Sequence, residues 1–421
     1  MADQLFYTGF EGGARDQLAS LSATGLVFLD DGKARTGQFV ANCQAITAAA
    51  AIGFGRADLP TPGQAIADGN YATATARIYF KLENYPSLAN VNIFGFGVQP
   101  ANFAANLVMN TTGNVAAALD SVGSYSVFTL TADWYRADMT VVYTNPTIGN
   151  TTVTITVNIY LVDFLTHEEI LEGTVTHTKT FGVLVPSVPA PEFGHSDAIV
   201  STYNCKFDDW ITRVQDNGPA TLPVSTRITR IDSTSQAILI GFTGDWRNTI
   251  DIPRETTLTN EQAVAAAIGT STFFHETAEE LELVRIEALT VYVQAKETGA
   301  TADNTSVLIG TVPTAISLGT AYPTRPYAVQ RWLPLNNNDF TNLTWGLKVN
   351  VANSVQFAQC YAEVLHAGGD IFGTRLIGTG GWKQKCGTYL GNGTFQEIID
   401  VGFRPQIVLI KKCSGSSSAG W

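Results

Sequence analysis

The sequence has few charged residues, and positive ones are the scarcer kind. Only 15% of the 421 residues are Asp, Glu, Lys or Arg, and 25 Lys+Arg against 37 Asp+Glu give a formal net charge of −12. Binding to nucleic acid relies on clustered Lys and Arg that displace counterions, and no basic stripe is present. A nucleic-acid partner is therefore not expected.

Long apolar runs are also missing. No stretch approaches the roughly 20 apolar residues that span a bilayer. The N-terminus, Met1-Ala2-Asp3-Gln4, has neither a basic start nor the apolar centre of a signal peptide. We therefore expect a protein that is made in a cytoplasm, stays soluble and does not insert into a membrane.

Cysteine and histidine are rare, with five of each. The cysteines lie far apart without a C-x-x-C, which argues against a zinc site and against a secreted disulfide framework. We expect them to be reduced and structural. The histidines are isolated in sequence and show no catalytic pattern. No cofactor, metal site or catalytic residue is predicted. The residues concerned are Cys43, Cys205, Cys360, Cys386 and Cys413, and His167, His177, His195, His275 and His366.

Strand and turn patterns dominate what remains. Residues 152–161 alternate between apolar and polar side chains, as in a strand with one buried face. Its apolar face consists of Val153, Ile155, Val157, Ile159 and Leu161. Similar stretches are separated by turns, which predicts an all-β protein built as an antiparallel β-sandwich. A single short helix is expected at Asn260–Ile268, where Thr259 or Asn260 can cap it.

The chain divides into three predicted segments. The first spans 1–215 and ends at the turn signals Asp216-Asn217-Gly218-Pro219. The second, 223–368, is predicted to be another β-sandwich, with half-buried strands at 289–295 and 345–351. The third, 379–421, contains Gly391-Asn392-Gly393 between two extended runs, which indicates a hairpin. Because three strands rarely form a stable domain, this segment is expected either to continue past Trp421 or to oligomerise.

Three parts of the first segment carry a resemblance to a known fold family. They are the opening Phe6–Gly12, the strand that starts Trp134-Tyr135-Arg136, and the closing Cys205–Ile211 with its Asp208-Asp209 pair. Together they are similar to the concanavalin A-like (LamG-type) jelly roll. The resemblance implies that the first and last strands pair with each other.

The later segments resemble parts of tailed-phage proteins. Gly244-Asp245-Trp246 followed by the strands at 286–296 and 345–349 is similar to a module found behind LamG-like domains in phage structural proteins, although the loop 250–270 lacks the usual acidic, serine-rich form. The string from Gly387 to Lys411 resembles a C-terminal repeat of phage tail and fibre proteins.

These resemblances imply a virion structural protein of a tailed bacteriophage, assembled in the host cytoplasm. The leading hypothesis is a non-enzymatic tail fibre or receptor-binding component that takes part in host attachment. Its partners are expected to be other virion proteins, further copies of the chain in a trimer, and a host surface glycan. A capsid decoration protein is the first alternative. A surface lectin or glycoside-active enzyme is the second.

Three motifs are candidates for catalysis or ligand binding. Strand alternation sends Asp208 and Asp209 to opposite faces unless the strand bulges, so they do not form a general acid/base pair. His275-Glu276 starts like H-E-x-x-H, but Glu279 replaces the second histidine, which favours a solvated acidic face. Phe94-Gly95-Phe96-Gly97 has no following helix to bind a pyrophosphate, so its glycines are expected to allow close packing or a bulge.

Tryptophan is the residue best suited to stack on a sugar, because its ring has an apolar face and its N–H can donate. Core packing is expected for most of them. Trp246 and Trp332 neighbour loop-like residues and are the two predicted glycan-stacking residues. The tryptophans expected in the core are Trp134, Trp210, Trp345 and Trp382.

Overall fold

The computed structural model describes most of the chain up to residue 367. The described residues are 4–10, 18, 20–21, 26–29, 40–45, 54–56, 71–97, 104–120, 122–147, 149–163, 168–183, 188–194, 202–216, 222, 226–245, 262–275, 285–298, 305–323, 326–335 and 337–367. They form strands joined in antiparallel sheets and one short helix, α1 (Asn337–Thr341), so the predicted all-β class is confirmed. The chain divides after Gly369, and the predicted hairpin segment lies outside the described residues.

Of the described strands, eight form the first sheet, called here the eight-stranded sheet. Its order is β13-β12-β11-β6-β15-β4-β3, and β1 pairs with β15. The strands are β1 (Gln4–Thr8), β3 (Leu26–Leu29), β4 (Val40–Ala45), β6 (Tyr71–Asn84), β11 (Trp134–Thr147), β12 (Asn150–Val162), β13 (Glu169–Phe181) and β15 (Tyr203–Asp216). The pairing of β1 with β15 is the one that the jelly-roll resemblance implied.

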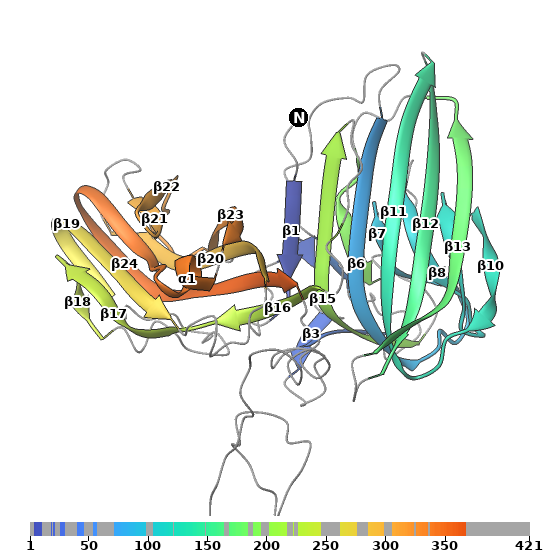
Figure 1. Ribbon diagram of the computed structural model, residues 1–421, viewed down its shortest axis with the longest axis horizontal. Coiled ribbons are helices and arrows are strands. Elements are labelled where there is room, and N and C mark those ends of the chain that lie inside the picture. The colour runs from blue at the N-terminus through green and yellow to red at the C-terminus, as the bar shows by residue number, and fades with distance from the viewer. Residues whose placement is uncertain are drawn as a thin grey trace, which may run out of the picture. The chain divides into compact units, whose positions relative to one another are not determined.

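A further seven described strands form the seven-stranded sheet, in the order β10-β9-β8-β7-β14-β5-β2. They are β2 (Ser20–Leu21), β5 (Phe54–Arg56), β7 (Val91–Phe96), β8 (Ala105–Met109), β9 (Asn114–Leu119), β10 (Val122–Thr129) and β14 (Pro191–Gly194). Figure 1 shows β7 and β8 behind the strands of the eight-stranded sheet, with β10 at the right. One apolar core, to which both sheets contribute, holds them together as a β-sandwich.

Strand β12 shows how the sequence pattern becomes this sandwich. Val153, Ile155, Val157 and Ile159 are fully buried, while the alternating polar residues are partly exposed. Burying one such side chain stabilises the fold by about 1.5–3 kcal/mol, whereas a one-residue shift would expose all four. The alternation therefore fixes which face of the sheet is left for solvent.

The remaining described strands form the nine-stranded sheet. Its path is β17-β19-β24-β20-β23, with β16, β18, β21 and β22 attached. They are β16 (Thr226–Ile231), β17 (Ser233–Ile240), β18 (Thr243–Gly244), β19 (Gln262–His275), β20 (Arg285–Glu297), β21 (Thr305–Ile309), β22 (Val312–Ile316), β23 (Tyr327–Leu335) and β24 (Trp345–Ala367). The 23-residue strand β24 pairs with β16, β19, β20 and β21, and the sheet has a core of its own.

Strand β20 is buried on both faces, although the sequence predicted one. Leu289, Val291 and Val293 lie in the core of the nine-stranded sheet, as expected. Thr290 on the other face is also buried, because its hydroxyl donates to Tyr7 Oη of β1 at 3.0 Å. The polar residues of β20 therefore do not mark a solvent-exposed face, because a hydrogen bond satisfies the buried hydroxyl of Thr290.

The helix expected at Asn260–Ile268 is a prediction that the structure contradicts. Residues from Gln262 onward belong to β19, which is paired on one side with β17 and β18 and on the other with β24. A nine-residue helix is marginal by itself, and two flanking strands satisfy the same backbone groups. Tertiary pairing overrides the local helix signal.

The glycines of Phe94–Gly97 have the role that the sequence predicted. A Cβ atom on Gly95 would lie 2.3 Å from the backbone oxygen of Ala105 in β8. The pairing of β7 with β8 also shifts register between Asn92 and Phe94, which marks a bulge. Close approach of two strands therefore explains Gly95 without a phosphate ligand.

Candidate functional site

The outer face of the eight-stranded sheet, the face turned away from the sandwich core, carries two organised groups of polar side chains. Four neighbouring strands contribute, β6, β11, β12 and β13. Residues opposite one another in register form rows across the sheet, since directly paired residues share a face. Arg136 lies between Tyr79 and Tyr160, and Asp138 lies between Arg77 and Asn158.

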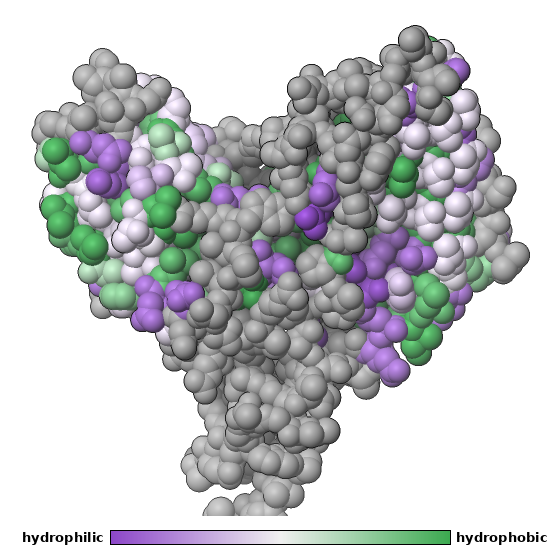
Figure 2. Space-filling view, turned by 45° about the horizontal axis from the view of Figure 1, so that its top comes forward, coloured by the Kyte–Doolittle hydropathy of each residue, from purple (hydrophilic) through white to green (hydrophobic). Residues whose placement is uncertain are grey.

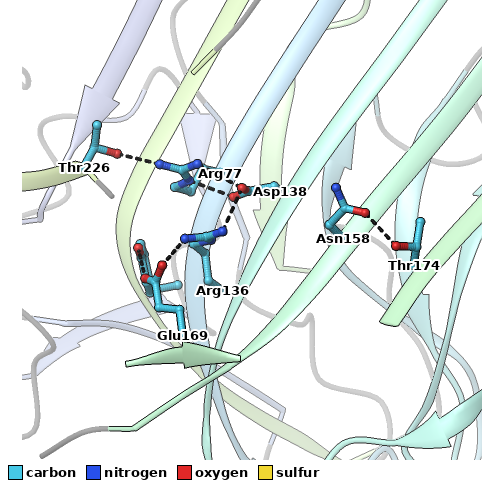
Figure 3. A network of polar contacts seen from close by, with 8 residues as sticks. Arg77, Arg136, Asp138, Asn158, Glu169, Thr174 and Thr226 are labelled. Atoms are coloured by element: carbon cyan, nitrogen blue, oxygen red, sulfur yellow. Dashed lines mark hydrogen bonds and ion pairs between the residues drawn. The ribbon is translucent and has the colours of Figure 1, made fainter. Parts of the chain in front are cut away.

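Arg77 and Asp138 form a bidentate ion pair (Figure 3). Arg77 Nε lies 2.7 Å from Asp138 Oδ1, and Nη2 lies 2.9 Å from Oδ2. Arg77 Nη1 also donates to Thr226 Oγ1 of β16 at 3.1 Å. Burial disfavours the charged guanidinium, but the hydrogen bond and charge of Asp138 outweigh it, so the pKa of Arg77 is raised. Arg77 stays protonated and fixes β6 to β11.

Arg136 bridges two carboxylates, that of Asp138 and that of Glu169. Its Nη2 lies 3.3 Å from Asp138 Oδ2, and its Nη1 pairs with Glu169 Oε2. Tyr79 Oη donates to Glu169 Oε1 at 2.6 Å. The guanidinium of Arg136 also lies 3.8 Å from the ring centre of Tyr160, in cation–π geometry. Arg77, Asp138, Arg136 and Glu169, called here the arginine network, hold Tyr160 at the edge of the open face.

The arginine network is balanced and mostly covered. Two guanidinium groups face two carboxylates, so it adds no net charge to the sheet. Arg77 and Arg136 are 4% and 6% exposed. These side chains therefore act as a scaffold for the neighbouring surface.

Beside the network, β12 and β13 present a regular array of hydroxyl groups. The array is called here the threonine face and consists of Thr152, Thr154, Thr156, Asn158, Thr174, Thr176, Thr178 and Thr180. Its members pair across the two strands. The Oγ1 atoms of Thr152 and Thr180 are 3.1 Å apart, as are those of Thr154 and Thr178.

The array continues toward the arginine network. Thr176 Oγ1 donates to Thr156 Oγ1 at 3.4 Å, and Thr174 Oγ1 donates to Asn158 Oδ1 at 2.7 Å, as Figure 3 shows for the second pair. A hydroxyl offers one donor and two acceptor positions, so each pair keeps hydrogen-bonding capacity for solvent or a ligand. The two strand backbones that carry these pairs are about 4.8 Å apart, and successive pairs follow one another at about 6.8 Å along the strands.

The two predicted glycan-stacking residues are not tested by the structure. Trp246 lies outside the described residues. Trp332 lies in β23 with its backbone opposite Ala288, and its side chain is outside the described part. Trp134, Trp210 and Trp345 are buried, so core packing is confirmed for these three.

The Asp208-Asp209 pair sits at a bulge. The pairing of β15 with β6 shifts register between Asp208 and Ile211, and Asp209 has φ of 42°. Both side chains are buried: Asp208 Oδ1 accepts from the Asp209 N–H at 2.8 Å, and Asp209 Oδ1 accepts from the Ile228 N–H at 3.1 Å. Both carboxylates thus hold backbone amides, and Asp209 connects β15 to β16.

His275 is not on a solvated acidic face, contrary to prediction. It is buried at the end of β19, where its ring stacks on that of Trp345 with 4.2 Å between ring centres. The tilted ring of Phe340 lies 4.4 Å away. The acidic residues after it, 276–280, lie outside the described residues. The apolar core of the nine-stranded sheet explains the burial, because a stacked imidazole covers the Trp345 ring.

The cysteines that the structure describes agree with the prediction. Cys43, Cys205 and Cys360 are free and buried, and burial raises the pKa of each thiol. Across the described ranges, His, Cys, Asp and Glu do not gather into a group of three that could hold a metal ion. No helix within those ranges is long and apolar enough to cross a membrane.

Sequence reasoning missed the arginine network. A signal was present, because Arg136 and Asp138 are two residues apart on one strand and so share a face. Their partners Arg77 and Glu169 come from strands far away in sequence. The register that brings them together is set by the apolar face of each strand, which polar motifs do not reveal.

Known protein families were compared with the chain, and none matches it. A comparison with curated proteins also gives no match. Solved structures do match, each over about half of the chain. Arcelin-5, a lectin-like defense protein from Phaseolus vulgaris, is 9% identical and covers 51% of this chain and 99% of its own, with a TM-score of 0.31.

Several of the matching structures are enzymes. The PL-14 alginate lyase from Aplysia kurodai is 10% identical and covers 47% of this chain and 91% of its own, with a TM-score of 0.30. A carbohydrate esterase from the Shiga toxin-encoding bacteriophage phi24B is 13% identical and covers 47% and 89%, with a TM-score of 0.27. The prediction that the chain is not an enzyme, which was drawn from the lack of a catalytic pattern in the sequence, is therefore wrong, because alginate lyases and a carbohydrate esterase are among the structures that match.

Proposed function

We propose that this chain is a host-attachment component of a tailed-phage virion that binds a surface polysaccharide through its threonine face. The observation that carries the binding proposal is the array of paired hydroxyl and amide groups on β12 and β13, which ends at the Tyr160 ring. The place in the virion, at the tail, is supported by the sequence resemblance of the second and third segments to phage tail and structural proteins.

The chemistry of the threonine face suits an uncharged polyhydroxy ligand. Its hydroxyls can donate to and accept from sugar hydroxyls, and its threonine methyl groups provide apolar contact. The balanced charges of the arginine network leave a strongly anionic or cationic ligand without a specific partner. A neutral polysaccharide lying across the strands would meet paired polar side chains from two backbones that are about 4.8 Å apart.

Binding is tested with an array of bacterial surface polysaccharides. The paired substitutions Thr176→Lys and Thr178→Lys place two long cationic side chains on the threonine face and are expected to weaken binding at least about tenfold, since ordered hydroxyl contacts are lost. A matched control carries Thr311→Lys and Thr314→Lys, two exposed threonines by the β21–β22 hairpin. Unchanged binding by the first variant, or no wild-type binding above background, contradicts the proposal.

The place in the virion is tested separately by gold labelling of intact particles carrying a tagged copy of the chain. We expect label at the tail, because the chain there contacts the host surface. The untagged virion controls for background. Label spread over the head would instead support the capsid decoration alternative.

A further inference from the structure

Strands β17 and β19 expose large apolar side chains at one edge of the nine-stranded sheet. The exposed fractions are 44% for Ile238, 46% for Leu239, 61% for Ile240, 58% for Ile268 and 45% for Phe274. These five residues are called here the β17 edge. Figure 2 shows hydrophobic side chains gathered at the left, over this sheet. Single exposed apolar residues are ordinary, but a contiguous group indicates an interaction surface.

Three members of the β17 edge share the face of the sheet opposite to its core. Ile238 pairs with Thr272, and Ile240 pairs with Thr270. Phe274 follows Thr272 by two positions and so points the same way. Phe273, by contrast, belongs to the core. These three exposed side chains therefore lie on the outer face and cannot be buried by closer packing of the core.

The strand at this edge is uncharged and has one partner. Among the described strands, β17 pairs with β19 alone. The 8 residues of β17 and the 14 of β19 include no Asp, Glu, Lys or Arg. Edge strands usually carry a lysine, a proline or an inward charge that prevents pairing with another chain. The β17 edge has no charged residue or proline that would prevent such pairing, so another strand can pair with it.

We propose that the β17 edge binds a second copy of this chain, with the two β17 strands antiparallel about a two-fold axis at Leu239. In that register Leu239 lies opposite Leu239 of the partner copy, and Ile238 lies opposite the partner's Ile240. The sequence Ile238-Leu239-Ile240 reads the same in both directions, so one surface supplies both sides, as a two-fold interface requires. The pairing continues the nine-stranded sheet into the second copy.

The charge of the chain favours a second copy over a charged peptide. Two chains with net charges of −12 repel each other, so they approach most easily where neither surface carries charge. A peptide recognised by its charge would find no complementary group on these strands. A trimer built on a three-fold axis, by contrast, would need a different surface.

The first test is the solution mass of the full chain by light scattering coupled to size exclusion. We expect a dimer of about 90 kDa, twice 45.1 kDa. Ile240→Lys should raise the dimer dissociation constant at least about tenfold, because a charge is then buried against apolar side chains. Val312→Lys is the matched control, since Val312 is 48% exposed in β22 of the same sheet, and it should leave the mass unchanged. Circular dichroism checks that both variants fold.

The second test fixes the register. In a chain with Cys386→Ser and Cys413→Ser, Leu239→Cys should form a disulfide between copies under mild oxidation, because directly opposed strand residues bring their Cβ atoms within bonding range. Val312→Cys is the control. A monomer at about 100 µM, well above micromolar dissociation constants, would overturn the proposal. So would an oligomer that survives Ile240→Lys, or equal cross-linking of both cysteine variants.

Discussion

Replacing Trp210 with alanine is expected to lower the free energy of unfolding by about 3–5 kcal/mol. The Trp210 side chain is fully buried in β15, where it packs in the sandwich core. Its ring centre lies 5.2 Å from that of Phe6 and 5.1 Å from that of Phe193, both edge-on. The loss is large because a single domain is stable by only about 5–15 kcal/mol. Urea denaturation followed by circular dichroism measures it.

The conservative substitution Trp210→Phe controls for this effect. It keeps an aromatic ring against Phe6 and Phe193, and it removes an indole N–H that is buried without a hydrogen-bond partner. The cost should therefore stay below about 2 kcal/mol, as the remaining volume loss is smaller. If the alanine variant unfolds within about 1 kcal/mol of wild type, Trp210 is not the core residue described here.

Asp138→Asn is expected to cost about 3 kcal/mol. The substitution keeps the size of the side chain but removes the charge that pairs with both Arg77 and Arg136, leaving Glu169 as the other carboxylate of the network. Both guanidinium groups are nearly buried, and a buried charge without its counterion is strongly destabilising. Thermal and urea unfolding of the variant measure the loss.

Asp120→Asn is the matched comparison. Asp120 Oδ2 lies 2.8 Å from Lys179 Nζ, with side-chain exposures of 24% and 34%, so solvent screens the pair. We expect its loss to cost less than about 1 kcal/mol. Asparagine also tolerates the φ of 49° at this position. Equal effects of the two substitutions would show that the arginine network is no more buried than an ordinary surface pair.

The apolar pattern predicted the sandwich well because it records burial directly. In β12 every second residue from Val153 to Ile159 lies in the core. The same reasoning worked for Gly95, since a glycine inside an apolar strand indicates close approach of a neighbour. It worked less well for β20, where the second face is covered by a contact from β1. Alternation of apolar and polar residues predicts that one face of a strand is buried, but it does not predict whether the polar face is exposed to solvent.

Local patterns misled at two positions where distant partners decide the outcome. The cap and alanine-rich run near Asn260 favour a helix, yet the neighbouring strands β17, β18 and β24 take these residues into a sheet. His275 precedes acidic residues, yet it stacks on Trp345, which is 70 positions away in the printed sequence. Both errors arise because the prediction used residues that are close in sequence, whereas contacts with residues that are distant in sequence stabilise the observed structure.

By itself the sequence determined the β class, the apolar face of the long strands and the structural role of the described cysteines, because each follows from local periodicity or composition. Only the tertiary structure decided which polar residues meet. Arg77, Asp138, Arg136 and Glu169 come together through the register of three strands, and the threonine face arises because β12 and β13 align their hydroxyls. The register of these strands is set by burial of their apolar faces in the core. The arrangement of polar residues on the outer face therefore follows from how the core packs.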